Sequence, residues 1–254
     1  MTKIDGTMRD GVESIRQESH TGSVRTGVTV IIPALNEEKT IGEVVGQVPC
    51  HIADEIIVVD NGSDDRTTER ALEFGACVVS EPRRGYGQAC QAGVRAVSRD
   101  CEIIVFLDGD GSDCPQLMEQ LVAPIAAGTY DFVIGSRTRG EREPGSMNFQ
   151  QIFAGRSAGF LLRALYGVRY TDMCPFRAIR RQALDRLPMR ETTYGWNLEM
   201  QMRAARARLR ILEVPVNHRR RAGGESKVSG TISGSVRAAG RILTTLARIA
   251  LERH

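Results

Sequence analysis

The sequence predicts an α/β fold in which helices cover both faces of a mostly parallel β-sheet. Short apolar runs rich in Val and Ile recur along the first half of the chain, and each ends in turn residues. Longer segments of helical character lie between these runs, so strands and helices alternate. This alternation is typical of a parallel sheet whose crossover connections pass through helices.

The first half is expected to hold five strands, at residues 28–32, 54–60, 76–80, 102–107 and 130–135. Helices are expected at 67–74, 88–99 and 115–127. Asn36, ahead of Glu37 and Glu38, and Asp113, ahead of Pro115, are each placed to cap a helix N-terminus.

The second half is less regular. Residues 139–148 form a polar loop with glycine and proline, a candidate mobile lid. Further elements are expected at 152–165 (helix), 194–206 (helix), 209–216 (strand), 219–227 (basic loop) and 232–252 (helix). The chain is therefore divided into a flexible leader (1–27), one α/β domain (28–230) and a basic amphipathic C-terminal helix (231–254).

The composition is that of a soluble globular protein, with 41% apolar and 26% charged residues in 254. Six scattered cysteines without a C-x-x-C pair indicate free thiols in a reducing compartment. No apolar run reaches the roughly 18 residues that would span a bilayer, so a cytoplasmic location is expected. Aromatic residues are only 5%, and no basic patch is interleaved with them, which argues against nucleic-acid binding.

Polar side chains follow all five expected strands, at the point where each strand ends. The carboxyl ends of parallel strands meet at one edge of a sheet, and ligands bind there. The residues concerned are Asn36 and Glu37, Asp60 and Asn61, Arg83 and Arg84, Asp108 and Asp110, and Arg137. Acidic and basic groups thus alternate around one rim.

Asp108-Gly109-Asp110 has two interpretations. The carboxylates repel each other unless a cation lies between them, and oxygen ligands suit Mg²⁺ or Mn²⁺. Alternatively, the motif is a polar turn that leads into a helix. Because the four other expected strands also end in polar or charged side chains, the metal site is the favoured interpretation.

Three motifs in this order and spacing resemble the family 2 glycosyltransferases of GT-A (Rossmann-like) fold. They are residues 32–38 (IPALNEE), 59–67 (VDNGSDDRT) and 108–110 (DGD). Residues 135–137 (GSR), 176–177 (FR) and 221–227 (RAGGESK) extend the resemblance towards the dolichol-phosphate mannose synthase branch. The resemblance covers about residues 28–230.

The resemblance implies a nucleotide-sugar donor, a UDP- or GDP-hexose, bound with Mg²⁺ or Mn²⁺. Base and ribose would contact Pro33, Ala34, Glu37, Asp60 and Asn61. Most members have a second Asp at the position of Asn61, so the chain departs from the family there. Asp108 and Asp110 would hold the metal on either side of Gly109, and Arg84, Gln88 and Arg137 would lie near the diphosphate. The expected reaction is an inverting transfer without a covalent sugar–enzyme intermediate.

Two acceptor classes stay open. A sugar hydroxyl needs a general base, for which Asp172 and Glu199 are the candidates. A lipid phosphate is already anionic and needs cations and donors instead, which Arg156, Ser157, Arg177, Arg221 and Lys227 could supply. The resemblance to the lipid-phosphate branch favours the second class, a polyprenyl phosphate.

The expected C-terminal helix bears on the acceptor. Its apolar stripe and its row of arginines fit peripheral contact with the inner face of an anionic membrane, or packing on the domain or on a partner. Two other functions fit the sequence less well. A sugar-nucleotide pyrophosphorylase would carry a Gly-rich basic loop after the first strand, which residues 33–38 lack. A non-catalytic nucleotide- or lipid-binding module would not need paired metal carboxylates. The sequence leaves the sugar and the oligomeric state open.

Overall fold

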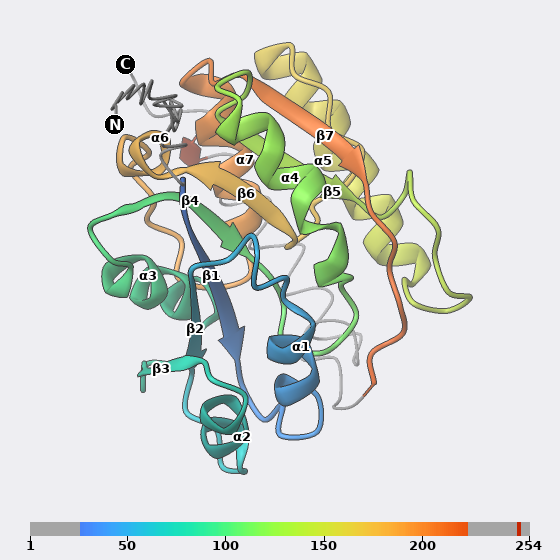
Figure 1. Ribbon diagram of the computed structural model, residues 1–254. Helices are drawn as coiled ribbons and strands as arrows, with labels where there is room; N and C mark the ends of the chain where they lie inside the picture. The colour runs from blue at the N-terminus through green and yellow to red at the C-terminus, as the bar shows by residue number, and fades with distance from the viewer. Residues whose placement is uncertain (1–25, 223–247, 250–254) are drawn as a thin grey trace, which may run out of the picture.

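A computed structural model describes residues 26–222 and 248–249 of the chain. Its centre is a seven-stranded sheet in the order β3-β2-β1-β4-β6-β5-β7 (Figure 1). The strands are β1 (Gly27–Ala34), β2 (Glu55–Asp60), β3 (Cys77–Ser80), β4 (Cys101–Phe106), β5 (Phe132–Ser136), β6 (Arg177–Arg180) and β7 (Ile211–Pro215). The helices are α1 (Ile41–Gln47), α2 (Thr67–Glu73), α3 (Tyr86–Ala96), α4 (Met118–Ala126), α5 (Phe149–Tyr166), α6 (Arg181–Asp185) and α7 (Trp196–Arg206), and a 3₁₀ turn, η1 (Pro115–Leu117), precedes α4.

The sheet is parallel except for β6, which runs antiparallel to both β4 and β5. β1 pairs with β2 and β4 in parallel register, and β7 pairs with β5 in the same way. The carboxyl ends of β1, β2, β3, β4, β5 and β7 therefore open on one edge of the sheet. This arrangement confirms the mostly parallel α/β fold and its single polar rim.

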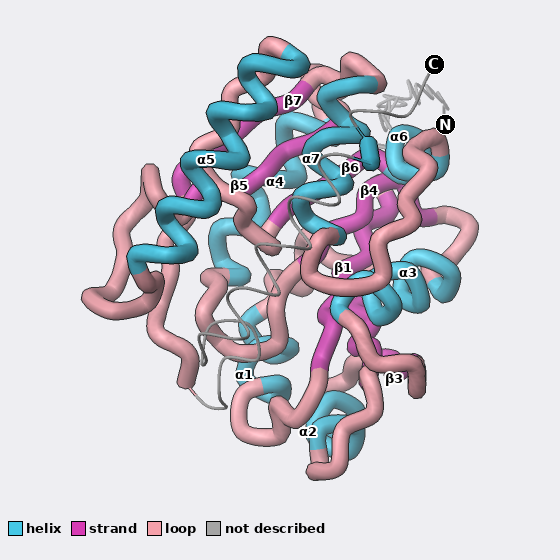
Figure 2. The backbone as a smooth tube through the Cα atoms, turned by 180° about the vertical axis from the view of Figure 1, so that it is seen from behind, coloured by secondary structure: helices cyan, strands magenta, loops and turns pink. Residues whose placement is uncertain are grey.

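Helices cover both faces of the sheet. α4 packs on β4, β5 and β6 and lies in front of the sheet in Figure 1. α5 and α7 pack on each other and lie on the opposite side, which Figure 2 shows. The central strands are buried on both faces, so Ile31, Val58 and Ile104 are completely enclosed.

Two expected helix caps are wrong. Asn36 lies in a turn at positive φ (55°), and α1 begins only at Ile41. The Asn36 side chain instead accepts a hydrogen bond from the amide of Asp64. Asp113 also caps no helix, because Cys114 precedes η1 and makes no side-chain cap, whereas the Asp113 carboxylate accepts from the amide of Asp108.

The helix after the polar loop begins at Phe149 rather than at Ile152. Asn148 and Gln151 form a reciprocal capping box, in which each side chain accepts from the backbone amide of the other. The loop predicted at residues 139–148 includes Asn148, so the prediction places this helix cap in the loop. The C-terminal part of the expected lid is therefore a fixed helix start.

The expected leader (1–27) and the C-terminal helix (231–254) lie almost wholly outside the described residues. Within the described part, the chain has no helix that combines the length and the apolar character needed to cross a membrane.

Gly93 lets α3 approach the sheet closely, because a Cβ atom there would lie 2.4 Å from Cγ2 of Ile31 and 3.1 Å from Cγ2 of Val59. We expect Gly93→Ala to lower the free energy of unfolding by about 1–3 kcal/mol through overpacking. Gly46→Ala in α1 is the control, since the nearest atom, on the exposed ring of Phe74, lies 3.3 Å away. Urea unfolding of both variants checks this expectation, and equal stability of the two would contradict it.

Candidate active site

The rim of the sheet is organised around the turn after β4. Asp108 is half-buried, and its carboxylate accepts a hydrogen bond from the Tyr86 hydroxyl at 3.1 Å. Burial raises the pKa of Asp108 to about 8, and the charges of Asp110 and Asp113 add to the effect, against Arg221. Three acidic groups this close favour a neutral Asp108 until a cation joins them.

Asp110 is 3% exposed and already has partners. One carboxylate oxygen accepts from the amide and hydroxyl of Ser112, and the other lies 2.8 Å from Nε of Arg221. The Arg221 guanidinium thus supplies the positive charge at this carboxylate. Among the described residues, no three acidic, histidine or cysteine side chains are arranged ready to hold a metal.

His218 is a rim residue that the sequence analysis missed. It follows β7, is 5% exposed, and its Nδ1 lies 3.7 Å from Oδ1 of Asp113. Neither of these two buried atoms has a hydrogen-bond partner within the described part of the chain. The strand-end pattern could have found His218 had it been followed to the seventh strand.

The chemical types of the donors at this turn suit a divalent cation, although the described side chains are not arranged as a ready-made site. Asp108, Asp110, Asp113 and His218 supply oxygen and imidazole ligands, and two of their buried atoms lack a partner. The backbone holds them together, since the amide of Arg219 donates to the carbonyl of Ser112 at 2.8 Å. A cation bound here would have to displace Arg221 from Asp110.

The turns after β1 and β2 are tied to each other. The amide of Glu37 donates to Thr67 Oγ1 at 2.8 Å, and the amide of Asn36 donates to Ser63 Oγ at 2.9 Å. Asp60 accepts from the amide of Ser63. The expected nucleoside residues therefore lie close to these joined turns: Pro33 and Ala34 end β1, Asp60 ends β2, and Glu37 is in the first turn. Ala34 is buried and the other three are half-buried.

The Asn61 side chain is turned towards the loop after β3, and its expected contact with the base stays a prediction. Its side chain is 4% exposed and donates to the carbonyls of Glu81 and Arg83, both at 2.8 Å. Its oxygen accepts from the amide of Gly85 at 2.7 Å. Asn61 therefore clamps the loop after β3, a task that needs the two N–H donors of an amide.

The clamped loop carries Arg84, and Gln88 follows in the first turn of α3; both residues are expected near the diphosphate. Arg84 is exposed and pairs with Asp64 at 3.5 Å, across the mouth of the β2 turn. The backbone amide of Gln88 donates to the carbonyl of Thr192. Gly85 and Gly87 are required here, since a Cβ at either position would lie 2.3 Å from the carbonyl oxygen of Thr192 or Glu191.

Arg137 and Asp172 form a bidentate ion pair, with N···O distances of 2.7 and 2.8 Å. Asp172 is 2% exposed. Burial opposes its ionisation, but the hydrogen bonds and charge of Arg137 outweigh burial, so the pKa of Asp172 lies below its ordinary value. Asp172 is thus a weak base that fixes the orientation of Arg137.

Two expected site residues lie in the core instead of on the rim. Glu199 is completely buried and is held by Arg203 at 2.9 Å, Arg248 at 3.1 Å and two backbone amides. Arg177 is also completely buried and donates to the carbonyls of Cys174 and Asn197. Burial lowers the pKa of Arg177. The structure contradicts a catalytic-base position for Glu199 and a phosphate-facing position for Arg177.

The remaining expected residues lie beside the rim or beyond the described chain. Arg156 is exposed and Ser157 half-buried, both on α5. Gly109 is buried on the floor of the β4 turn, where a Cβ would lie 3.3 Å from Cδ1 of Ile41. Lys227 lies outside the described residues.

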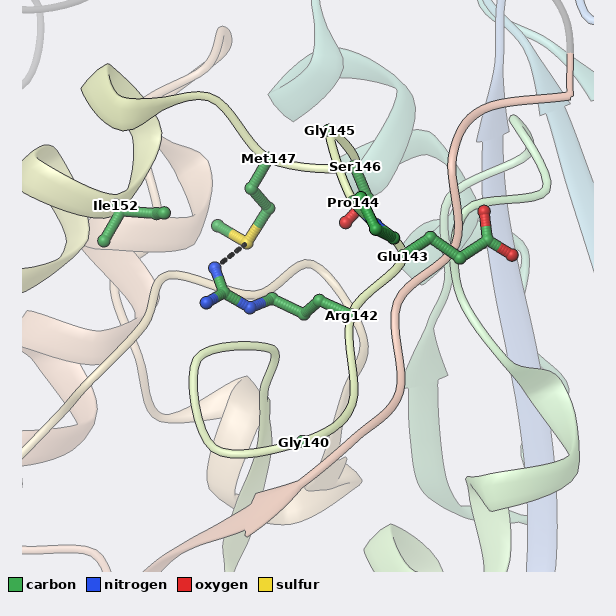
Figure 3. Close-up of a pocket in the computed structure, with 8 residues that line it drawn as sticks. All are labelled: Gly140, Arg142, Glu143, Pro144, Gly145, Ser146, Met147 and Ile152. Carbon is green, nitrogen blue, oxygen red and sulfur yellow. Dashed lines mark hydrogen bonds between the residues drawn. The ribbon is translucent and has the colours of Figure 1, made fainter.

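A cavity of about 400 Å³ adjoins the rim (Figure 3). It is lined by the polar loop from Gly140 to Met147 and by Ile152 of α5. Glu143 points away from the other lining side chains in Figure 3 and accepts from the amide of Arg220. This contact ties the loop to the segment after β7, and the mobility of the loop stays a prediction.

We expect Asn61→Asp to lower the free energy of unfolding by about 1–3 kcal/mol, because a carboxylate would face two carbonyls that have lost their donors. Asn217→Asp is the matched control. Asn217 is exposed and its oxygen only accepts, from the amide of Glu141, as a carboxylate also can. Denaturant unfolding of both variants at neutral pH measures the difference. If the two variants unfold at the same denaturant concentration, the donated hydrogen bonds of Asn61 do not contribute to stability.

Comparisons with known proteins agree with the fold and with the motifs of the rim. Residues 29–187 match the model of the glycosyl transferase family 2. A dolichyl-phosphate hexose transferase of Haloferax volcanii is 35% identical over 213 residues, which cover 82% of this chain and 89% of that protein. An undecaprenyl-phosphate mannosyltransferase of Micrococcus luteus is 33% identical over 223 residues, with the same coverage of both chains.

Solved structures extend the likeness to the fold. Glucosyl-3-phosphoglycerate synthase of Mycobacterium tuberculosis, in complex with Mn²⁺, UDP-glucose and phosphoglyceric acid, superposes with a TM-score of 0.69 at 25% identity. The match covers 90% of this chain and 81% of that one. The same enzyme with Mg²⁺ and UDP gives a TM-score of 0.70. With its mostly parallel GT-A sheet, this chain belongs to glycosyl transferase family 2, near the branch of the dolichol-phosphate mannose synthases.

Proposed function

We propose that this glycosyltransferase moves a hexose from a UDP- or GDP-sugar to a polyprenyl phosphate, with inversion and with Mg²⁺ or Mn²⁺. The observation that supports a phosphate acceptor is that both candidate bases are held in ion pairs with arginines. Asp172 is held by Arg137, and Glu199 by Arg203 and Arg248. An acceptor that is already anionic does not need the base that these carboxylates fail to supply.

The donor side follows from the rim. The joined turns after β1 and β2 offer Pro33, Glu37 and Asp60 to the nucleoside, and the β4 turn offers Asp108 and Asp110 to the cation. The bound cation would neutralise the charge that develops on the leaving nucleoside diphosphate. Arg137, fixed by Asp172, directs a positive charge towards the same region and can hold an anionic acceptor in line with the anomeric carbon.

The relatives support this acceptor class, because the names of two of them specify dolichyl and undecaprenyl phosphates. A second candidate acceptor is a small phosphorylated molecule with a free hydroxyl. The superposition on glucosyl-3-phosphoglycerate synthase favours that candidate. The polar cavity beside the rim is large enough for part of either acceptor.

The test is a matrix of donors and acceptors analysed by mass spectrometry. UDP- and GDP-hexoses are combined with a short-chain polyprenyl phosphate or with 3-phosphoglycerate, each with Mn²⁺ and with a chelator. We expect a hexosyl phosphopolyprenol from one donor class, and no product with the chelator. If the enzyme transfers the hexose efficiently to 3-phosphoglycerate but not to the polyprenyl phosphate, the proposed lipid acceptor is wrong. If no combination gives either transfer or hydrolysis of the donor, the proposed glycosyltransferase function is refuted.

The raised pKa of Asp108 predicts a pH dependence of metal binding. Below its pKa of about 8 the metal-free protein keeps Asp108 protonated, so Mn²⁺ must displace a proton. We expect Mn²⁺ affinity to rise up to about tenfold per pH unit towards pH 8, with proton release visible by calorimetry in two buffers. Asp100→Asn, at an exposed position before β4, is the control and should bind Mn²⁺ as the parent does.

The same pKa predicts the stability of the metal-free protein. The folded state binds the Asp108 proton more tightly than the unfolded chain does, so stability falls as pH rises from about 4 to about 8. Asp108→Asn keeps this position neutral, and we expect its melting temperature to exceed that of the parent at pH 8 but not at pH 4. If the difference in Tm between the parent and Asp108→Asn is the same at pH 4 and at pH 8, the raised pKa of Asp108 is contradicted.

A further inference from the structure

The exposed apolar side chains of this protein are concentrated on one helix. Among the described residues, eight large hydrophobic side chains are exposed, and five of them belong to α5. These are Phe149, Phe153, Phe160, Leu161 and Leu165, with exposed fractions from 37% to 79%. Figure 2 shows α5 on the outside of the molecule, and the aromatic rings of Phe149 and Phe153 stack on each other.

The exposed phenylalanines form one stripe. At about 100° per residue, Phe149, Phe153 and Phe160 project within about 40° of one another. The opposite side of the helix is buried through Ala158 and Leu162. A helix that has already buried one face in the core has no need of a second apolar face for folding, so this stripe is suited to an external apolar surface.

The charge around the stripe is of one sign. Residues 144–171 contain no Asp or Glu, in a chain that has 31 acidic residues in 254. The same stretch carries three arginines, Arg156, Arg163 and Arg169, all exposed. Arg156 and Arg163 lie beside the phenylalanine stripe on α5. The nearest acidic residues before this stretch, Glu141 and Glu143, are on the polar loop and not on the helix.

We propose that the stripe formed by Phe149, Phe153 and Phe160, with Arg156 and Arg163 beside it, is a surface by which α5 lies on an anionic lipid bilayer. The rings enter the boundary between headgroups and acyl chains, while the arginines contact lipid phosphates. A second copy of this chain fits the surface less well, because a two-fold contact would bring the arginines of both copies together without an acidic partner on the same face.

The buried side of α5 connects this surface to the rim. A Cβ at Gly155 would lie 3.6 Å from Oδ1 of Asp172, the partner of Arg137. A helix with its side chains is about 10–12 Å thick, so a docked α5 places this ion pair within about one helix diameter of the bilayer. In that position Arg137 could meet a phosphate at the headgroup level while the lipid tail stays in the membrane. This advantage rests on the proposed lipid acceptor, whereas the docking itself does not.

Vesicle flotation of the full-length protein tests the docking without any sugar donor. With vesicles of equal parts phosphatidylglycerol and phosphatidylcholine, we expect binding that weakens in high salt and is much reduced on pure phosphatidylcholine. Phe153→Ser combined with Phe160→Ser should weaken binding about tenfold or more. Arg163→Gln should weaken it about fivefold on the anionic vesicles alone.

Leu72→Ser in α2 is the control, because Leu72 is also an exposed apolar side chain, with 55% exposure, but lies on another element. Circular dichroism melting of each variant verifies folding. Parent-like flotation of the double phenylalanine variant would overturn the proposal and assign any membrane contact to another segment. The oligomeric state, measured by sedimentation without vesicles, provides a second test. If the parent protein is a dimer that the phenylalanine substitutions convert into a monomer, the stripe is a dimer interface and the proposal is refuted.

The proposed transfer reaction can fail independently of the docking. Activity on a water-soluble short-chain polyprenyl phosphate should be unchanged in the double phenylalanine variant, whereas activity on a long-chain acceptor embedded in vesicles should fall with binding. A parent enzyme that floats as expected but transfers to neither acceptor refutes the function and leaves the membrane surface intact.

Discussion

The crowding of three carboxylates at the end of β4 is the constraint on which the rest of the rim depends. Asp108, Asp110 and Asp113 lie within six residues, with Asp110 and Asp113 buried and Asp108 half-buried. In a medium of low polarity such charges cannot coexist without compensation. The protein supplies it from two directions: the Tyr86 hydroxyl in α3 donates to Asp108, and Arg221, in the segment after β7, pairs with Asp110. The loops of the rim are arranged to bring these groups to one turn.

The opposite side of the rim uses charge in another way. Here the buried Asp172 is matched to Arg137 in a bidentate ion pair. Glu213 extends this pair by accepting from the amides of Thr171 and Asp172. One side of the rim therefore holds excess negative charge that awaits a cation. The other side holds Arg137, which is oriented by a carboxylate buried behind it, an arrangement that suits an anionic ligand.

The sequence predicted the fold and the rim well because both follow from local patterns. Apolar runs and their turn residues mark the strands, and parallel strands bring their ends to one edge. It could not predict that β6 enters the sheet antiparallel, since its four residues carry no signal of direction. Arg177 and Glu199 were misplaced for a related reason, because a charged residue gives no sign in one sequence that it will be buried against carbonyls or an ion-pair partner. The resemblance places Asn61 near the base, whereas the hydrogen bonds of its side chain depend on the path of a loop twenty residues away, which the motif does not contain.

The Asn61 clamp has a consequence for how this site can vary. Its three hydrogen bonds fix residues 81–85. The amide nitrogen of the side chain donates to two carbonyls and its oxygen accepts from one backbone amide, so this loop path requires an amide side chain. A chain with Asp at this position can satisfy the amide of Gly85 but neither carbonyl, and it needs another route for the loop that carries Arg84. The two features should thus covary, and an amide or acid at this single position would divide related sequences into groups that differ in the geometry of the loop that carries Arg84.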